Sequence, residues 1–234
     1  MQKPVCLITG VGDGTGAALA RRFARGGYQV AMLARNRDRL EALQHEIDDA
    51  RAYECDISDL DALSKVVDRI RAEMGQPDVL VHNAVSATFK TFLEADSQEL
   101  EHNFRVNTMS LYQLARELAQ AMIESGQGAI MVTGNTAALR GIPTYAAFAP
   151  TKAAQRILAQ SLARDLGPKG IHVAYITIDA AIDTPWTRDV YDRDKPDDYF
   201  SKPADIADEV FHVAHQPRST WSFDVEIRPY GEKW

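Results

Sequence analysis

The chain has 234 residues, of which 45% are hydrophobic and 25% are charged, and its formal net charge is −7. These values are typical of a soluble α/β domain with a sizeable core. Lys and Arg are dispersed, so the chain lacks the basic stripe that nucleic-acid binding needs. No apolar run approaches the ~20 residues of a membrane span. A glycine-rich turn comes too early for a secretory signal. We therefore expect a cytoplasmic protein with neither nucleic-acid nor membrane partners.

The two cysteines, Cys6 and Cys55, each lie in an apolar stretch that predicts a strand. Cysteine packs as a small hydrophobic side chain, so we expect two buried thiols. Two isolated cysteines suggest neither a disulfide framework nor a metal site. A reducing compartment is the corresponding expectation.

Short apolar runs alternate with helical patterns along the chain. The apolar runs predict strands at Val5–Thr9, Gln29–Leu33, Ala52–Cys55, Val79–His82, Ala129–Thr133, His172–Ile178 and Phe223–Ile227. The helical patterns predict helices at Ala17–Arg25, Asp38–Ile47, Leu60–Met74, Glu99–Ile123, Thr151–Leu166 and Pro203–His215. Strands that are apolar throughout and alternate with helices indicate a doubly wound parallel sheet. We predict one Rossmann-type α/β domain over residues 1–234, with a seven-stranded parallel sheet flanked by helices.

A glycine-rich turn follows the first predicted strand and opens the first predicted helix. Its residues are Gly10, Val11, Gly12, Asp13, Gly14, Thr15 and Gly16. Glycines allow a tight turn and let the backbone approach a pyrophosphate closely, and the helix N-terminus offers unpaired N–H groups. The position of the turn between a strand and a helix predicts a dinucleotide site.

The end of the second predicted strand indicates which dinucleotide binds. Sites that prefer NAD place an acidic residue there to bond the ribose 2′-hydroxyl. Here the strand is followed by Arg35, whose planar guanidinium suits a 2′-phosphate. Asp13 argues the other way, because a basic residue in the turn would suit the phosphate better. We predict NADP(H) as the preferred cofactor, with NAD(H) as the alternative.

The spacing Gly10-x3-Gly14-x-Gly16 resembles that of the short-chain dehydrogenase/reductase family. Further matches are Asp56, His82-Asn83-Ala84-Val85, Asn107, Lys152 and Ile182-Asp183-Thr184-Pro185. The resemblance implies an adenine contact for Asp56 and cofactor contacts for Asn83 and Ala84. It also implies a mid-helix role at the active site for Asn107, a ribose contact for Lys152, and contacts of Ile182 and Thr184 with the nicotinamide amide. The long helix Glu99–Ile123 and the Thr151–Leu166 helix resemble the family's oligomer interface, which implies a homodimer or homotetramer.

Two catalytic positions depart from the family pattern. The family uses Ser, Tyr and Lys, with Tyr as the proton donor. At the corresponding positions this chain has Asn135, Phe148 and Lys152. Phenylalanine has no exchangeable proton. Asn135 can donate a hydrogen bond to a carbonyl oxygen but cannot supply a proton to it. The family's fold therefore carries over, and its proton-transfer mechanism does not.

Tyr145 is an alternative proton donor. Its spacing to Lys152 resembles the Tyr-x6-Lys pattern of the family's enoyl-thioester reductase branch. On a helix, residues 145, 148 and 152 would fall on one stripe, with Tyr145 one turn before Phe148. Such a hydroxyl would suit the distant oxygen of an enone better than a simple ketone.

Three functions remain open from the sequence. The first is an NADP(H)-dependent oxidoreductase with a non-standard active site, which reduces a carbonyl or a conjugated C=C bond of a small molecule. The second is an enoyl-type reductase that uses Tyr145 with Lys152. The third is a catalytically silent dinucleotide-binding sensor or scaffold. The polar segment Asp189–Asp198 is equally compatible with a mobile loop near the site and with a plain surface loop.

Overall fold

The computed structural model describes residues 3–190 and 195–231, and one parallel sheet forms its centre. Seven strands lie in the order β3-β2-β1-β4-β5-β6-β9. They are β1 (Val5–Thr9), β2 (Gln29–Ala34), β3 (Ala50–Glu54), β4 (Pro77–His82), β5 (Gly128–Gly134), β6 (Ile171–Ile178) and β9 (Asp224–Ile227). Every neighbouring pair runs parallel. The predicted seven-stranded Rossmann-type sheet is confirmed.

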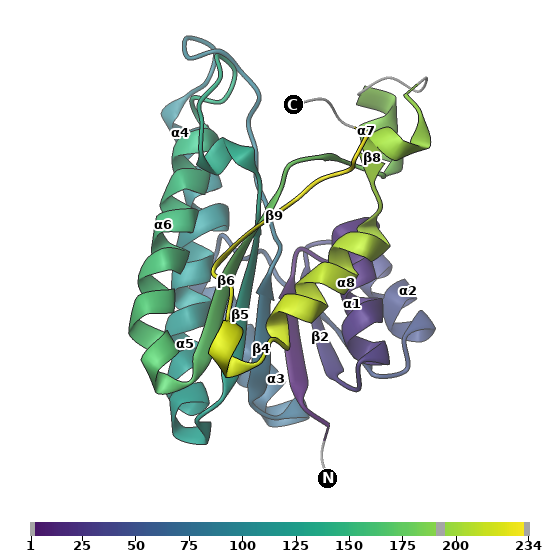
Figure 1. Ribbon diagram of the computed structural model, residues 1–234, viewed down its shortest axis with the longest axis vertical. Coiled ribbons are helices and arrows are strands. Elements are labelled where there is room, and N and C mark those ends of the chain that lie inside the picture. Colours follow the sequence, from purple (N-terminus) through teal and green to yellow (C-terminus); the bar gives the residue numbers. More distant parts are fainter. Residues whose placement is uncertain (1–2, 191–194, 232–234) are drawn as a thin grey trace.

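Helices cover both faces of the sheet (Figure 1). One layer contains α1 (Thr15–Arg25), α2 (Arg37–Glu46) and α8 (Pro203–Ala214). The other contains α3 (Leu60–Met74), α5 (Ser110–Ser125) and α6 (Ala149–Leu166), with α4 (Ser97–Phe104) at the upper end of α5. A short parallel pair, β7 (Ala181–Ile182) with β8 (Phe200–Ser201), and the helix α7 (Pro185–Val190) form a small unit above α8.

Alternating side chains of each strand supply two apolar cores, one on each face. In β1, Val5 and Leu7 join the core under α3, α5 and α6, whereas Cys6 and Ile8 join the core under α1, α2 and α8. This alternation follows from the two-residue period of a strand. Both faces are covered, which explains why the inner strands are largely apolar, whereas the edge strands β3 and β9 carry exposed charged residues.

The cysteines belong to different cores. Cys6 packs in the core beneath α1, and Cys55, which follows β3, packs in the opposite core. Both thiols are buried and free, as predicted.

The predicted helix Glu99–Ile123 lies within one helical run over residues 97–125, which contains a π-helical turn that the prediction did not include. A capping box of Asp96 and Glu99 starts α4, and a π-helical turn over Arg105–Met109 separates α4 from α5. Such wide turns occur mostly as single insertions at functional sites. A contact with α6 holds the turn, since Thr108 Oγ1 donates to the Thr151 carbonyl oxygen at 2.9 Å. The helical pattern of the sequence could not predict this contact, because it joins two elements that are distant along the chain.

The helix that carries Lys152 begins at Ala149, two residues earlier than predicted. Pro150 lies in its first turn, where the missing N–H is not needed. Phe148 and Tyr145 precede the helix in a turn closed by the Phe148 N–H donating to the Tyr145 carbonyl oxygen at 2.9 Å. The expectation that residues 145, 148 and 152 share one helical stripe is therefore wrong.

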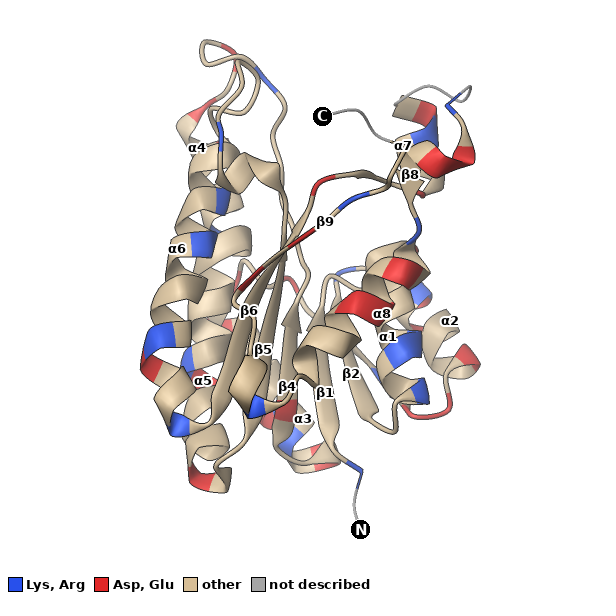
Figure 2. Ribbon diagram, viewed as in Figure 1, with Lys and Arg blue, Asp and Glu red and all other residues tan. Residues whose placement is uncertain are grey.

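Charged residues of both signs are interspersed over the helical layers (Figure 2). Among the described residues, no helix combines the length and the apolarity that crossing a membrane would need. The predicted segment Asp189–Asp198 falls partly outside the description, because residues 191–194 are not described.

Candidate cofactor and active site

The site lies where the order of connections along the sheet reverses, between β1 and β4. Open α/β sheets bind ligands at the carboxyl ends of strands at this point. Thr9 Oγ1 accepts hydrogen bonds from the Asn83 and Ala84 N–H groups at 3.1 and 3.2 Å. The Asn83 side-chain amide donates to the Gly10 carbonyl oxygen at 3.0 Å. These bonds hold the glycine-rich turn against the segment after β4.

Three glycines of the turn are required by close contacts. Gly10 has φ +70°, and a Cβ there would lie 2.5 Å from Ala84 Cα. A Cβ on Gly16 would lie 2.3 Å from the Gly10 carbonyl oxygen, and one on Gly14 would lie 2.9 Å from Thr184 Cγ2. The turn therefore brings its backbone close to both the post-β4 segment and the β7–α7 segment.

The first turn of α1 is suited to an anion. Its N-cap is Gly14, which offers no side-chain cap. Thr15 Oγ1 is buried, and it finds no hydrogen-bond partner among the described residues. The first N–H groups of any helix lack intrahelical partners, and they attract phosphate. A phosphate oxygen at this point would satisfy both the backbone groups and the Thr15 hydroxyl.

A cavity of about 750 Å³ opens at this turn. Its lining includes the predicted residues Gly10, Gly12, Gly14, Thr15, Gly16, Arg35, Asp56, Asn83, Ala84, Ile182 and Thr184. Asp13 lies at its rim through an ion pair with Arg39. The volume is in the range of small-molecule and cofactor sites. The structure thus brings together the predicted cofactor residues, apart from Lys152.

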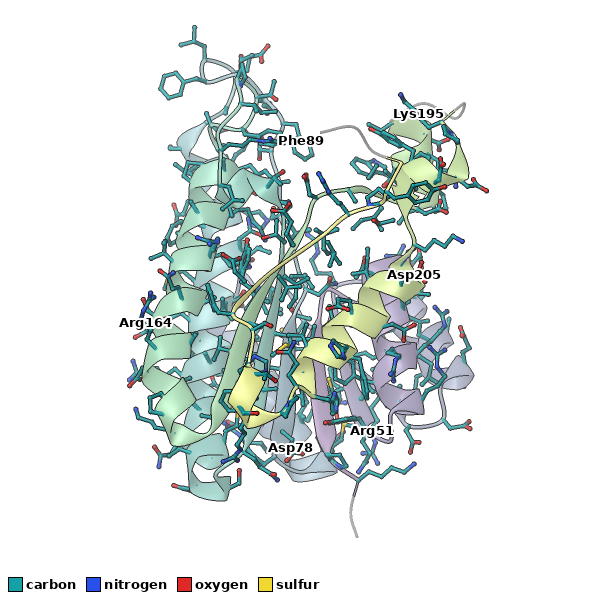
Figure 3. The ribbon with its side chains drawn as sticks, viewed as in Figure 1. Arg51, Asp78, Phe89, Arg164, Lys195 and Asp205 are labelled. Atoms are coloured by element: carbon teal, nitrogen blue, oxygen red, sulfur yellow. The ribbon has the colours of Figure 1, made fainter. Side chains whose placement is uncertain are left out.

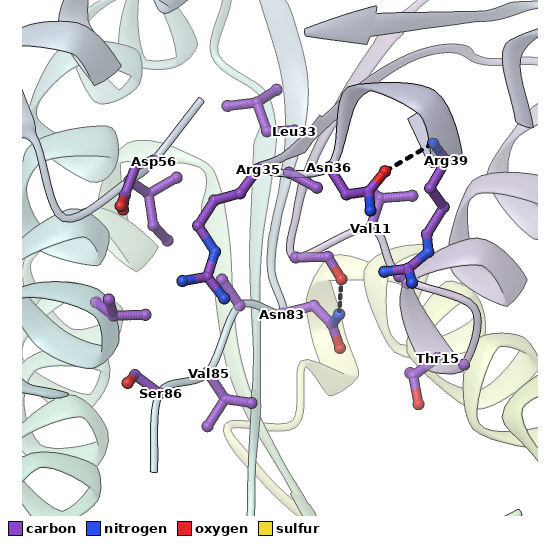
Figure 4. Close-up of a pocket in the computed structure, with 18 of the residues that line it drawn as sticks. Val11, Thr15, Leu33, Arg35, Asn36, Arg39, Asp56, Asn83, Val85 and Ser86 are labelled. Carbon is purple, nitrogen blue, oxygen red and sulfur yellow. Dashed lines mark hydrogen bonds between the residues drawn. The ribbon is translucent and has the colours of Figure 1, made fainter. Parts of the chain in front are cut away.

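Two arginines reach the cavity after β2 (Figure 4). Arg35 lies beside Asp56, whose pKa is lowered: burial acts against this, but hydrogen bonds from Ser58 and the charge of Arg35 outweigh it. Arg39 was missed by the sequence analysis. The Asn36 side chain caps α2 by accepting from the Arg39 N–H at 2.9 Å. This places Arg39 Nε 2.8 Å from Asp13 Oδ1, across the glycine-rich turn.

Asn107 joins three segments at the other end of the site. Its Oδ1 accepts from the Ser86 N–H at 3.0 Å, and its Nδ2 donates to the Ser86 carbonyl oxygen and to Thr151 Oγ1, each at 2.8 Å. Asn107 is fully buried. Its side chain therefore fixes the loop after β4 onto α6.

Lys152 is also buried, at 1% exposure, and it is not part of the cavity lining. Its Nζ donates to the Gln155 side-chain oxygen and, at 3.4 Å, to the Thr133 carbonyl oxygen. Burial lowers the pKa of Lys152 to about 7. His82 is equally enclosed, and burial together with the charge of Lys152 lowers its pKa to about 3. His82 is therefore a neutral structural residue at neutral pH.

Phe148 is buried, with 2% exposure. Its ring meets Phe89 edge-on at 5.7 Å and Tyr145 edge-on at 5.6 Å between centroids. Phe89 points from its loop toward the middle of the upper edge of the molecule (Figure 3). The half-buried Tyr145 thus forms an aromatic cluster with Phe89 and Phe148.

Asn135 directly follows β5, and its Oδ1 accepts from the Ala137 N–H at 3.2 Å. That bond orients the amide, and its nitrogen makes no hydrogen bond to the part of the chain that the structure describes. Asn135 therefore retains two N–H groups with which it could donate to a substrate oxygen.

The fold and the turn together define a dinucleotide-binding protein of the doubly wound type. The chain belongs to the short chain dehydrogenase family, whose profile matches residues 4–195. Among curated relatives, versicolorin reductase stcU of Emericella nidulans is 33% identical over 174 residues, 72% of this chain and 66% of the relative's length. L-xylulose reductase of Mus musculus is 30% identical over 168 residues, 71% of this chain and 67% of that protein.

Solved structures of related proteins have a similar fold over nearly the whole chain. A metagenomic short-chain oxidoreductase in complex with NADP has a TM-score of 0.86 at 27% identity, covering 99% of both chains. The alcohol dehydrogenase of Thermococcus sibiricus with 5-hydroxy-NADP has a TM-score of 0.87 at 26% identity, covering 98% of both. A short-chain dehydrogenase from Sphingobium yanoikuyae with NADPH reaches 0.81 at 28% identity, covering 95% of this chain and 87% of that one.

Proposed function

We propose that this protein is an NADP(H)-dependent oxidoreductase that reduces a carbonyl or a conjugated C=C bond of a small molecule. The observation that carries the proposal is the cavity at the glycine-rich turn, with Arg35 just after β2 and Arg39 in the first turn of α2. The structures that hold NADP or NADPH in related proteins support the same cofactor. We propose that residues 1–234 form one dinucleotide-binding domain, because the described helices and the short β7–β8 pair all accompany one central seven-stranded sheet.

The two arginines explain how an NADP(H) preference is compatible with Asp13 in the glycine-rich turn. The Asp13 carboxylate would repel a phosphate if it were alone. In the structure it pairs with Arg39, so the rim of the turn carries a guanidinium beside the carboxylate. Arg35 and Arg39 then supply two cations, and the described end of β2 offers no acid to bond a ribose 2′-hydroxyl.

The catalytic end can polarise an oxygen, but it lacks the family's acid. When bound, the nicotinamide supplies or accepts the hydride. The Asn135 amide can donate to a substrate oxygen as charge develops on it. Lys152 is buried next to the Thr133 carbonyl oxygen, and with a pKa of about 7 it adds positive charge there only near or below neutral pH. Phe148 can move no proton, so reduction needs a proton from elsewhere.

The enoyl-type alternative rests on the aromatic cluster. The Tyr145 ring contacts Phe148, so a phenol lies next to the position where the family has its own. The isolated bridge between Tyr145 and Lys90 anchors its backbone to the loop after β4. We propose Tyr145 as the first candidate proton donor, with an enone or enoyl thioester as the matching substrate.

The cofactor preference is tested by titrating NADPH and NADH against single variants. A charge-assisted hydrogen bond contributes about 1.5–3 kcal/mol. Arg35→Ala and Arg39→Ala should therefore each weaken NADPH binding at least about tenfold and leave NADH nearly unchanged. Arg37→Ala is the matched control, because Arg37 pairs with Glu41 at 2.7 Å and does not line the cavity.

Equal affinities of the wild type for the two cofactors would contradict the NADP(H) preference. If NADPH binds but neither a carbonyl nor an enone panel oxidises it, the protein is a dinucleotide-binding sensor or scaffold. Assembly into a dimer or tetramer stays a prediction.

A further inference from the structure

Gln155 lies one turn after Lys152 on α6 and is completely buried. Its Nε2 donates to the Asn107 carbonyl oxygen at 2.7 Å and lies 3.2 Å from His82 Nδ1. A primary amide has two N–H donors on one side and one carbonyl acceptor on the other. The sequence analysis did not find this residue.

The partners of Gln155 fix which way the amide faces. The Asn107 carbonyl oxygen can only accept. His82 Nε2 lies 2.8 Å from Ser110 Oγ, which itself donates to the Val106 carbonyl oxygen at 2.6 Å. Because the Ser110 hydroxyl proton is used, His82 must donate through Nε2, and its Nδ1 must accept. Both N–H groups of Gln155 are then engaged, and its carbonyl oxygen faces Lys152.

Lys152 completes this arrangement as a donor. Its ammonium has only N–H groups to offer, and the Gln155 oxygen is directly within reach. We infer that Gln155 is a positioning residue: its side-chain carbonyl holds the Lys152 ammonium at the base of the catalytic end, and Asn107 and His82 hold Gln155. The functional role that we infer for Gln155 rests on the proposed oxidoreductase function, whereas the geometry rests on the observed contacts.

The surroundings of Lys152 make Gln155 its main polar partner. His82, at the end of β4, is the titratable side chain in this hydrogen-bond network, and it contacts Gln155. The π-helical turn contributes the Asn107 carbonyl through Gln155, and β5 contributes the Thr133 carbonyl at 3.4 Å. None of these described partners carries a negative charge. The charged form of Lys152 therefore depends on neutral acceptors, and the nearest one belongs to Gln155.

The test reads the protonation of Lys152 in the cofactor-free protein. The Lys152 side-chain Nζ and Cε signals are followed by NMR across pH in protein labelled at lysine, with Lys152→Met giving the assignment. The wild-type midpoint is expected at about 7. Gln155→Met removes the acceptor and should lower the midpoint by about one unit or more. Gln155→Glu puts a carboxylate against the ammonium and should raise it by about one unit or more.

Opposite shifts separate positioning from a purely structural role, which would change stability in both variants without opposite effects on Lys152. Gln113→Met is the matched control, because Gln113 is a partly buried amide on α5 that bonds Ser64 and Glu117. It should leave the Lys152 midpoint unchanged. If Gln155→Met does not fold, the rise in Gln155→Glu decides alone.

Midpoints that stay at the wild-type value, or that move in the same direction in both variants, overturn the inference. This readout needs neither turnover nor cofactor. Failure of the proposed function would instead show in NADPH titration of the wild type, so the two failures are distinguishable.

Discussion

The two ends of the site are built in different ways. The cofactor end is made largely of backbone: glycines, a helix N-terminus and the Thr9–Asn83 bonds position it. The end that we propose as catalytic is made of side chains, among them Asn135, Phe148 and Lys152. The contrast indicates that backbone geometry positions the cofactor end, whereas the chemistry of the other end depends on which side chains it carries.

The largest expected effect restores the missing chemistry at the catalytic end. A general acid typically contributes about 10²–10⁴-fold to the rate. Asn135→Ser combined with Phe148→Tyr should raise NADPH-dependent reduction of small ketones by up to about that factor. The measurement is steady-state NADPH oxidation across a carbonyl panel, with each single variant assayed beside the double variant.

Tyr145→Phe, measured in the same assay with an enone panel, tells which donor the wild type uses. Loss of enone reduction would assign the proton to Tyr145, whereas an unchanged rate would leave that ring as packing. A wild type that already reduces simple ketones at ordinary dehydrogenase rates would contradict our interpretation of Phe148.

The next effect concerns the cofactor end. Gly10→Ala combines a left-handed backbone with a clash against Ala84, so it should lower the free energy of unfolding by roughly 2–5 kcal/mol. Gly27→Ala is the matched control, with φ +91° but nothing within 4 Å of the added Cβ. It should cost only about 1–2 kcal/mol. Denaturant unfolding measures both, and equal losses would show that the contact with Ala84 is not required.

The last effect concerns Lys152, and it builds up gradually with pH. Its pKa is about 7 in the folded protein and 10.5 ordinarily, so between these values the unfolded chain holds one more proton. The free energy of unfolding should therefore rise with pH in this window, by at most ~1.4 kcal/mol per unit. Below pH 7 both states are protonated and the contribution to the slope disappears.

Denaturant unfolding at about pH 7.5, 8.5 and 9.5 compares the wild type with Lys152→Met, in which this rise should be absent. Lys169→Met, at an exposed lysine paired with Asp165, should keep the wild-type slope. A slope that survives unchanged in Lys152→Met would mean that the rise does not come from Lys152.

Much of the fold could be predicted because its signals are local. Strands that are buried on both faces are largely apolar, which makes them recognisable in the sequence. The glycine-rich turn between β1 and α1 is a motif that can be identified from its spacing and position. The predicted strand Val5–Thr9 and helix Leu60–Met74 match the structure to the residue. The cofactor residues followed from the same turn and from the family resemblance.

The parts that escaped prediction depend on contacts between distant segments. The π-helical turn at Arg105–Met109 is held by Thr151, which is 43 residues from Thr108. Arg39 acquires its role only when α2 begins at Arg37 and its side chain crosses to Asp13. Gln155 resembles any polar residue on a helix until β4 and the π-helical turn enclose it. Sequence periodicity does not reveal these contacts between distant segments.

The two buried thiols give this protein a pair of natural reporters for local opening. Cys6 and Cys55 lie in the cores on opposite faces of the sheet, and burial raises the pKa of each thiol, that of Cys55 to about 11. Reagent attack therefore waits until a layer separates and the thiolate can form. The chain has only these two cysteines, so the labelling rate at each one reports the breathing of a single helical layer, without any engineered probe.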